Sequence, residues 1–459
     1  MARILVLGGG LCGLSAGLML ARDGHAVSLL ERDAAPVPDS PERAWAGWAR
    51  GGVPQFKQAH GLMPRARIVL EEELPEVVGA CLEAGAAFSD PLASMPPTIT
   101  DRAPRAGDDR FRTLNVRRAV VEQVLARIAD AEPGLTVRRG AAVERLRTTG
   151  MNGSARVTGV RTGDGAEFAA DLVVDAMGRG SRLPRLLAGA QRDPGRDDVE
   201  AGRFVYYTRF FRGAEPVLRA PRLCHVGSLS IVTIPGDNGT WSVTLFAAAG
   251  DRALKQLRDP RTFAAVVGGL PRHAHWLEGE PISGVLPMGG VTDRLRAPAP
   301  STPGVLSVGD AWGCTNPSVG RGIAIGLMHV AVLREVVRER LGYGLEAVWR
   351  ERTDAELGHF HHAVVESDRA RLAVATAYRE GREPPAPQTP AERVGAALPQ
   401  AMGRDPDVFR AGLEIFGCLA PAHEVVARPG LAERVLALGG TVPPPPELER
   451  GALLDLIAA

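Results

Sequence analysis

Residues 3–17 read Arg-Ile-Leu-Val-Leu-Gly-Gly-Gly-Leu-Cys-Gly-Leu-Ser-Ala-Gly, and after an apolar run the chain continues as Ala26-Val-Ser-Leu-Leu-Glu31. Residues 4–7 are typical of a buried parallel strand, the next run has helical spacing, and a second aliphatic strand ends in an acid. In Gly8-x-Gly10-x-x-Gly13 the glycines let the backbone turn tightly and approach a pyrophosphate at a helix N-terminus. Glu31 follows the loop by about twenty residues, where a carboxylate accepts hydrogen bonds from a ribose diol. The stretch predicts a dinucleotide-binding βαβ unit.

The composition indicates a globular protein without a strong charge. The 459 residues carry a formal net charge of +1, so electrostatics give no reason to expect nucleic acid or an anionic membrane as a partner. No apolar run reaches the ~20 residues of a membrane span, and no signal peptide precedes the βαβ unit. The five cysteines are scattered without a C-x-x-C pair, which favours a reducing compartment over disulfides or a zinc site. We therefore expect a cytoplasmic protein of two or three domains.

A second type of pattern begins near residue 190. Residues 204–211 form an aromatic strand, Phe-Val-Tyr-Tyr-Thr-Arg-Phe-Phe, and residues 230–246 contain two strands around Asn238-Gly239. Asn-Gly between alternating apolar runs is the strongest short-range hairpin signal. The pattern predicts a mainly antiparallel sheet between about 190 and 285.

Two further glycine-containing turns follow aliphatic strands. One is Asp175-Ala-Met-Gly178 after residues 171–174, and the other is Gly309-Asp310 after residues 304–308. A strand that ends in Gly-Asp places a carboxylate at the carboxyl edge of a sheet, where ligands of open α/β folds bind. Gly320-Arg-Gly-Ile323 then begins a long apolar helix, whose free N–H groups and positive dipole end favour a negatively charged ligand.

Three features occur in this order: the N-terminal glycine loop, the Asp175-Ala-Met-Gly178 turn, and Gly309-Asp310 with the Gly320-x-Gly322 helix start. This arrangement resembles the FAD-dependent monooxygenases of the para-hydroxybenzoate hydroxylase type, including actinobacterial flavin hydroxylase- and epoxidase-like oxidoreductases. The resemblance covers essentially residues 1–340. The most similar group carries Arg-x-Gly-Val-Pro-Gln and Asp-Ala-Thr-Gly-Arg-Gly-Ser-Arg segments, which here are residues 50–55 and 175–182.

The resemblance implies an α/β fold with three parts. A Rossmann-like FAD-binding domain of the glutathione-reductase type is expected to be discontinuous, from residues 1–78, 105–187 and 286–340. An antiparallel β-sheet substrate domain is expected from residues 79–104 and 188–285, and a C-terminal helical region from 341–459.

The resemblance also implies which residues hold non-covalent FAD. Glu31 is expected at the adenosine ribose, Arg118 (with Arg117 as the alternative) near the phosphates, and Asp310 at the ribityl hydroxyls. The full expected set is Gly8, Gly10, Leu11, Cys12, Gly13, Glu31, Arg32, Arg50, Arg118, Val143, Asp175, Gly309, Asp310, Pro317, Gly320, Gly322 and Ile323. Because Asp175-Ala departs from the family's Asp-Gly signature, the electron donor is left open between NAD(P)H and a partner flavin reductase.

The implied reaction is monooxygenation with O₂ as co-substrate. Through C4a-hydroperoxyflavin the enzyme would hydroxylate or epoxidise an apolar or aromatic secondary metabolite, as in antibiotic biosynthesis. The residues expected to orient the substrate or move protons are Gln58, His60, Tyr206 and Arg209. His60 titrates near neutrality in its ordinary state, and only one of Tyr206 and Arg209 can face the flavin because the two lie on opposite faces of a strand. A loop histidine and an ordinary sheet face are the alternative interpretations.

Two other functions are left open by the sequence: a FAD-dependent reductase or dehydrogenase of the geranylgeranyl-reductase type, and a non-catalytic flavin-binding protein. His359, His362 and Glu366 have the helical spacing of metal ligands. No further cluster of ligands accompanies them, so we expect no metal.

Overall fold

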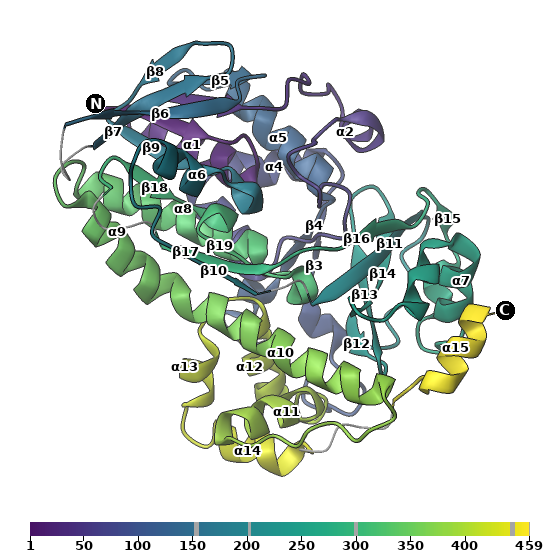
Figure 1. Ribbon diagram of the computed structural model, residues 1–459. Coiled ribbons are helices and arrows are strands. Elements are labelled where there is room, and N and C mark those ends of the chain that lie inside the picture. The colour runs from purple at the N-terminus through teal and green to yellow at the C-terminus, as the bar shows by residue number, and fades with distance from the viewer. Residues whose placement is uncertain (151–155, 201–202, 298–301, 441–445, 459) are drawn as a thin grey trace.

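The computed structural model describes residues 1–459 except 151–155, 201–202, 298–301, 441–445 and 459. Its central element is a parallel sheet with the strand order β18-β9-β1-β2-β5. The strands are β1 (Arg3–Leu7), β2 (Ala26–Glu31), β5 (Leu135–Arg139), β9 (Leu172–Asp175) and β18 (Val305–Ser307). The predicted Rossmann-like α/β fold is therefore confirmed, and its sheet is assembled from widely separated parts of the chain (Figure 1).

Helices cover this sheet and provide the largest apolar core. The helix after the glycine loop is α1 (Leu11–Arg22), and it packs against α5 (Arg118–Ala131) and α8 (Gly322–Glu339). Apolar side chains of all three helices belong to one buried cluster with those of β1 and β2. Three shorter helices join this layer: α2 (Pro41–Gly47), α3 (Pro64–Glu73) and α4 (Pro75–Glu83).

An antiparallel sheet forms a second layer, as predicted, with the strand order β12-β13-β14-β11-β15 and β16 pairing with β11. Its strands are β11 (Phe204–Arg212), β12 (Leu223–His225), β13 (Leu229–Pro235), β14 (Thr240–Ala248), β15 (Glu280–Pro281) and β16 (Leu286–Met288). The β13–β14 turn contains Asn238 and Gly239, both with positive φ, so the predicted Asn-Gly hairpin is confirmed. Since β16 lies beyond residue 285, the sheet extends into a segment that we expected in the FAD domain; the domain boundaries themselves stay a prediction.

Smaller sheets surround these two layers. They pair β3 (Ala87–Ser89) with β4 (Thr113–Asn115); β6 (Val143–Thr149) with β7 (Arg156–Thr162) and β8 (Glu167–Ala169); and β10 (Arg196–Glu200) with β17 (Asp293–Ala297) and β19 (Gly313–Cys314). Helix α6 (Leu183–Gly189) contacts β6, whereas α7 (Pro260–Gly268) joins the core of the antiparallel sheet.

The predicted C-terminal helices are present but do not form one unit. After α9 (Leu345–Thr353), the long helix α10 (His359–Arg379) crosses the molecule below the sheets in Figure 1. A separate apolar cluster unites α11 (Pro390–Met402), α12 (Pro406–Phe416), α13 (Ala422–Val426) and α14 (Leu431–Leu438). The last helix, α15 (Arg450–Ala458), instead packs against α7 and shares the core of the antiparallel sheet.

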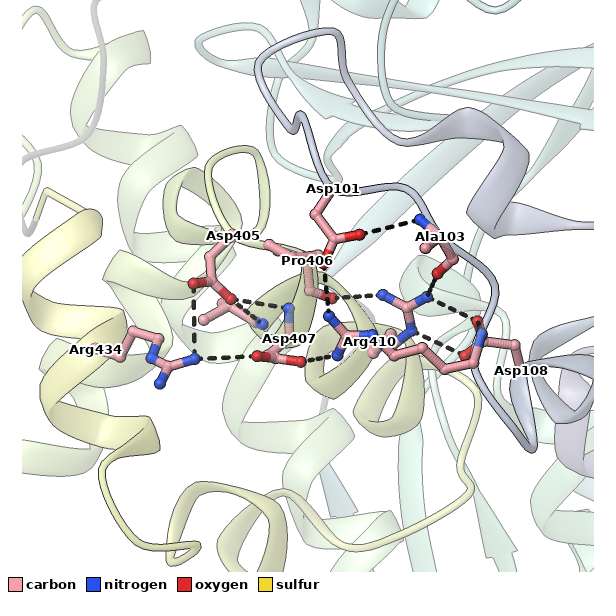
Figure 2. Close-up of polar contacts among 10 residues, drawn as sticks. Asp101, Ala103, Asp108, Asp405, Pro406, Asp407, Arg410 and Arg434 are labelled. Atoms are coloured by element: carbon pink, nitrogen blue, oxygen red, sulfur yellow. Dashed lines mark hydrogen bonds and ion pairs between the residues drawn. The ribbon is translucent and has the colours of Figure 1, made fainter.

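Ion pairs fasten α12 to residues 101–108, a segment about three hundred positions earlier in the chain (Figure 2). Arg410 donates to both carboxylate oxygens of Asp108, at 2.8 and 2.7 Å, and to the carbonyl of Ala103. Arg105 pairs with Asp407, which Arg434 also contacts. Among the described helices none is both long enough and apolar enough to cross a membrane.

Candidate active site

A single large cavity of about 2800 Å³ joins the parallel sheet, the antiparallel sheet and the C-terminal helices. Its lining includes the glycine loop and the start of α8 at one end, which we name the cofactor end. At the other end, named the helical end, it includes side chains of α10, α11 and α12. Ligand pockets usually measure about 300 to 1000 Å³. The cavity therefore has room for a cofactor together with a second sizeable molecule.

The glycine loop at the cofactor end needs its glycines for different reasons. A Cβ on Gly8, which has φ +106°, would lie 2.5 Å from the Ala176 carbonyl oxygen, and one on Gly13 would lie 1.9 Å from that of Gly8. A Cβ on Gly10 would meet no protein atom within 4 Å. The first and third glycines are thus required by packing, whereas Gly10 faces the cavity. Since α1 begins without a side-chain cap, its first N–H groups can bind an anion.

Glu31 is held at the end of β2 by hydrogen bonds to both of its oxygens. Oε2 accepts from the Gly9 N–H and Oε1 from the Asp33 N–H, each at 2.8 Å. Arg50 donates to the Gly9 carbonyl at 2.7 Å and lies 3.4 Å from Glu31. Glu31 lines the cavity, but Arg50 does not. Arg50 therefore orients the loop and the carboxylate from behind.

Arg117 and Arg118 are adjacent but serve different parts of the structure. Arg118 lines the cavity and donates to Glu122 at 2.6 Å. Arg117 is buried, and its guanidinium and backbone N–H bind the Asp237 carboxylate at the β13–β14 turn. This ion pair occupies Arg117, so of the two arginines only Arg118 is placed to contact a cofactor.

The turn after β18 presents a carboxylate to the cavity. Gly309 has φ +57°, and its N–H donates to His329 Nδ1 at 3.2 Å. The Asp310 carboxylate accepts no hydrogen bond from any described residue. Burial raises the pKa of this carboxyl group, and the positive charge of Arg118 opposes that rise. An unpaired carboxylate that lines a cavity is suited to accept hydrogen bonds from hydroxyl groups.

The start of α8 completes the cofactor end. The helix has no side-chain cap, and a Cβ on Gly320 or Gly322 would meet nothing within 4 Å. Its free N–H groups therefore face open space. Together, the uncapped α1 and α8, Glu31 and Asp310 match the phosphates, hydroxyls and electron-rich ring edge of FAD, so the residues present fit this cofactor.

The remaining residues of the expected FAD set divide into two groups. Leu11, Cys12, Arg32, Val143, Pro317 and Ile323 line the cavity. Gly13, Arg50, Asp175 and Gly309 lie behind its surface. Asp175 is fully buried and accepts from the Met177 N–H and the Ser181 hydroxyl. It shapes the turn, and Met177 and Arg179 face the cavity in its place.

His60 and Gln58 line the cavity where the cofactor end meets the antiparallel sheet. The Nδ1 of His60 donates to the Gln58 carbonyl at 3.0 Å, because a carbonyl oxygen can only accept. Burial and then the positive charge of Arg118 lower the His60 pKa to about 3. The expectation that His60 titrates near neutrality was therefore wrong: the imidazole is neutral and a weak base, and its Nε2, which has no hydrogen-bond partner among the described residues, can accept a hydrogen bond. The Gln58 amide bridges the Leu286 carbonyl and the Thr208 hydroxyl.

Tyr206 and Arg209 lie on opposite faces of β11, as the strand period requires. Tyr206 lines the cavity, and its hydroxyl donates to Asn316 Oδ1 at 2.9 Å. Arg209 donates to the Ser283 carbonyl and lies outside the cavity lining. The structure thus brings Gln58, His60 and Tyr206 to one cavity and leaves Arg209 apart.

Sequence reasoning missed Asp368 on α10. Asn316 Nδ2 donates to its carboxylate at 2.9 Å, and the Ser318 hydroxyl donates to it as well. Burial raises the Asp368 pKa to about 6, against the lowering effect of both hydrogen bonds. The signal that could have revealed it is a charged residue within the buried stripe of α10, beside Val364 and Val365.

A family model described as FAD binding domain matches residues 1–342. The chain belongs to this family. It is a FAD-dependent oxidoreductase, and its expected resemblance to the para-hydroxybenzoate hydroxylase type is confirmed. A relative from Mycobacterium tuberculosis, Protein Rv3254, is 27% identical and aligns with 73% of each chain.

Solved structures similar to this FAD-binding-domain protein show the same fold at low identity. PqsL of Pseudomonas aeruginosa, a probable FAD-dependent monooxygenase, is 18% identical with a TM-score of 0.59, covering 82% of this chain and 96% of its own. CabE, an aromatic hydroxylase from angucycline biosynthesis, is 18% identical with a TM-score of 0.56, covering 91% and 76%. The Diels-Alderase PyrE3 is 17% identical with a TM-score of 0.55, covering 95% and 81%.

The described part of the chain holds no group of three His, Cys, Asp or Glu side chains placed to bind a metal. His359 packs against Phe360 and the ring of His423. His359, His362 and Glu366 line the helical end of the cavity.

Proposed function

We propose that the protein is a FAD-dependent monooxygenase that hydroxylates or epoxidises an apolar or aromatic metabolite. The observation that carries this proposal is the continuity of the cavity, in which the cofactor end opens directly into an apolar helical end. Val394, Leu398, Leu413 and Phe416 line that second end. An apolar lining binds an apolar substrate and keeps water from the reacting atoms.

FAD, when bound and reduced, supplies the activation of O₂, for which no metal is required. The chain's own residues bind the cofactor and orient the substrate. The uncapped start of α8 would stabilise negative charge at the edge of the flavin ring, Glu31 and Asp310 would accept hydrogen bonds from hydroxyl groups of FAD, and Arg118 would bind its phosphates.

Between the two ends, His60 and Tyr206 are available to the substrate, and Ser318 has a positioning role. His60 Nε2 accepts a hydrogen bond from a substrate hydroxyl and so orients it, because the Nδ1–H is engaged by the Gln58 carbonyl. The Tyr206 ring offers a flat apolar surface and stacks on Phe246 with ring centroids 5.2 Å apart. Ser318, fixed by Asp368, orients the loop that precedes α8. The electron donor is NAD(P)H or a separate flavin reductase.

The experiment is turnover of the FAD-reconstituted protein with a panel of apolar aromatic compounds under isotopically labelled O₂. One set of reactions contains NADPH alone, and a second contains NADPH with an added flavin reductase. We expect one labelled oxygen atom in the product. A product formed without label would instead support the reductase alternative or, if it forms without reductant, a reaction of the kind named for PyrE3. Comparing the two sets identifies the electron donor.

A further inference from the structure

Arg371 of α10 is a buried cation that lines the cavity. Its Nε donates to the Ser230 hydroxyl at 3.0 Å, and its Nη2 donates to the carbonyls of Gly227 and Leu229 at 2.9 and 2.8 Å. All three acceptors are neutral. No carboxylate among the described residues lies within ion-pair distance of Arg371, and its Nη1 has no hydrogen-bond partner there. Arg371 as a whole is 9% exposed and contributes to the cavity lining.

Three other arginines that line the cavity differ from Arg371 because each has a carboxylate partner. Arg222 pairs with Glu215 at 3.1 Å, Arg272 pairs with Glu447 at 2.7 Å, and Arg369 pairs with Glu200. A buried guanidinium without a counter-charge is costly to maintain. Burial lowers the Arg371 pKa to about 10, so the group still carries its charge near neutral pH. A ligand that brings a negative charge would complete its environment.

An aromatic surface leads from Arg371 toward the cofactor end. Phe246 stacks on Tyr206, and the His225 ring meets Phe246 edge-on with centroids 6.5 Å apart. His225 Nδ1 lies 2.9 Å from the Ser230 hydroxyl. We assign the Ser230 hydroxyl as the donor to His225 Nδ1, and in that tautomer the neutral imidazole carries its proton on Nε2. His225 also lines the cavity, so it offers a second donor beside Arg371.

We propose that Arg371, with His225 beside it, binds an oxyanion of the substrate, either a carboxylate or an ionised phenol or enol. The aromatic part of the substrate then lies along Phe246 and Tyr206, with its far end toward the flavin. This inference rests on the proposed function, because it specifies the substrate class of the same cavity. Arginine suits the role, since its planar N–H groups match the two oxygens of a carboxylate.

The test uses the FAD-loaded protein and three probes of similar shape: naphthoate, naphthamide and naphthol. Each is titrated near neutral pH while the flavin absorbance spectrum and the thermal unfolding midpoint are recorded. We expect naphthoate to bind about tenfold or more tightly than naphthamide, as a charge-assisted hydrogen bond predicts. Arg371→Gln should remove this preference, Arg371→Lys should keep part of it, and Arg379→Gln on the same helix should keep all of it.

The wild-type protein alone can overturn the proposal, whether or not the variants fold. If naphthoate does not bind at least about tenfold more tightly than naphthamide, no acid-binding site exists at Arg371. A preference that survives Arg371→Gln also overturns it. Naphthol is un-ionised near neutral pH, so if it shares the preference and its bound form shows the absorbance of naphtholate, the oxyanion is phenolic or enolic; if only naphthoate shows the preference, the oxyanion is a carboxylate. The binding data need no turnover, so a failed labelling experiment with a retained acid preference refutes the proposed function alone.

Discussion

The two ends of the cavity are built in different ways. At the cofactor end, Glu31 ends β2, Asp310 and the start of α1 follow β18 and β1 within a few residues, and α8 begins after the short turn that follows β19. At the helical end, side chains from α10, α11 and α12 come together, and α12 is held to residues 101–108 across about three hundred positions. A site made of backbone can be recognised from glycines and their spacing. A site made of packed helices depends on contacts that no local pattern encodes.

The largest expected effect concerns Arg117, which ties the cofactor side of the molecule to the antiparallel sheet. Arg117→Met leaves the fully buried Asp237 without its partner, so we expect the free energy of unfolding to fall by about 3 to 5 kcal/mol. Arg118→Met should cost less stability and weaken FAD binding. Urea unfolding of the FAD-free protein and fluorescence titration with FAD measure the two effects. Equal losses of stability would contradict the division of roles.

A second prediction tests how the helical end is held. Arg410 is 8% exposed and joins α12 to Asp108, so Arg410→Met should lower the free energy of unfolding by about 2 kcal/mol. Arg434 also forms ion pairs, but its own side chain is 48% exposed. Arg434→Met is the matched control, with an expected change below about 1 kcal/mol. Hydrogen exchange should show faster exchange in α12 for Arg410→Met only, and similar exchange in both variants would refute this.

The third prediction is a pH dependence at Asp368, whose pKa of about 6 in the fold exceeds its ordinary value of 3.8. The native state holds this proton more tightly than the unfolded chain, so its contribution to stability is present at low pH and is lost as pH rises from about 4 through 6. Asp368→Asn cannot lose the proton. The free energy of unfolding of Asp368→Asn, relative to that of the wild type, should therefore increase by on the order of 2 kcal/mol between pH 4 and 7.

Urea midpoints at several pH values measure this gain. Glu366→Gln, an exposed carboxylate on the same helix, is the control and should follow wild type. Parallel curves for Asp368→Asn and wild type would show that Asp368 titrates as an ordinary carboxylate.

The smallest expected effect compares the same methyl group at the two ends. A Cβ meets no protein atom at either Gly10 or Gly395, and both glycines line the cavity. Gly10→Ala should weaken FAD binding about tenfold, or about 1.4 kcal/mol, because the methyl occupies space that the pyrophosphate needs. Gly395→Ala, in α11, should leave FAD affinity unchanged. FAD dissociation constants of the two variants are measured by fluorescence titration. Equal losses of FAD affinity would mean that the cofactor extends into the helical end.

Much of the fold could be predicted from local patterns. Gly8 and Gly13 predict the first turn because no side chain fits at either position. Asn238-Gly239 predicts the hairpin because both residues adopt positive φ. His60 illustrates the limit. Its residue type suggests titration near neutrality, but its actual pKa depends on burial and on Arg118, which only the folded chain brings near.

The sequence by itself determined the cofactor end and the family, because strand, glycine turn and helix are set by neighbours in the chain. The tertiary structure decided the rest: which of Arg117 and Arg118 meets the cavity, and which charges of α10 become buried. Asp368 and Arg371 look like ordinary polar residues of a helix until α10 packs against the segment before α8 and the antiparallel sheet. Their chemistry arises from removal of water and from partners fifty or more residues away, and a linear pattern carries neither.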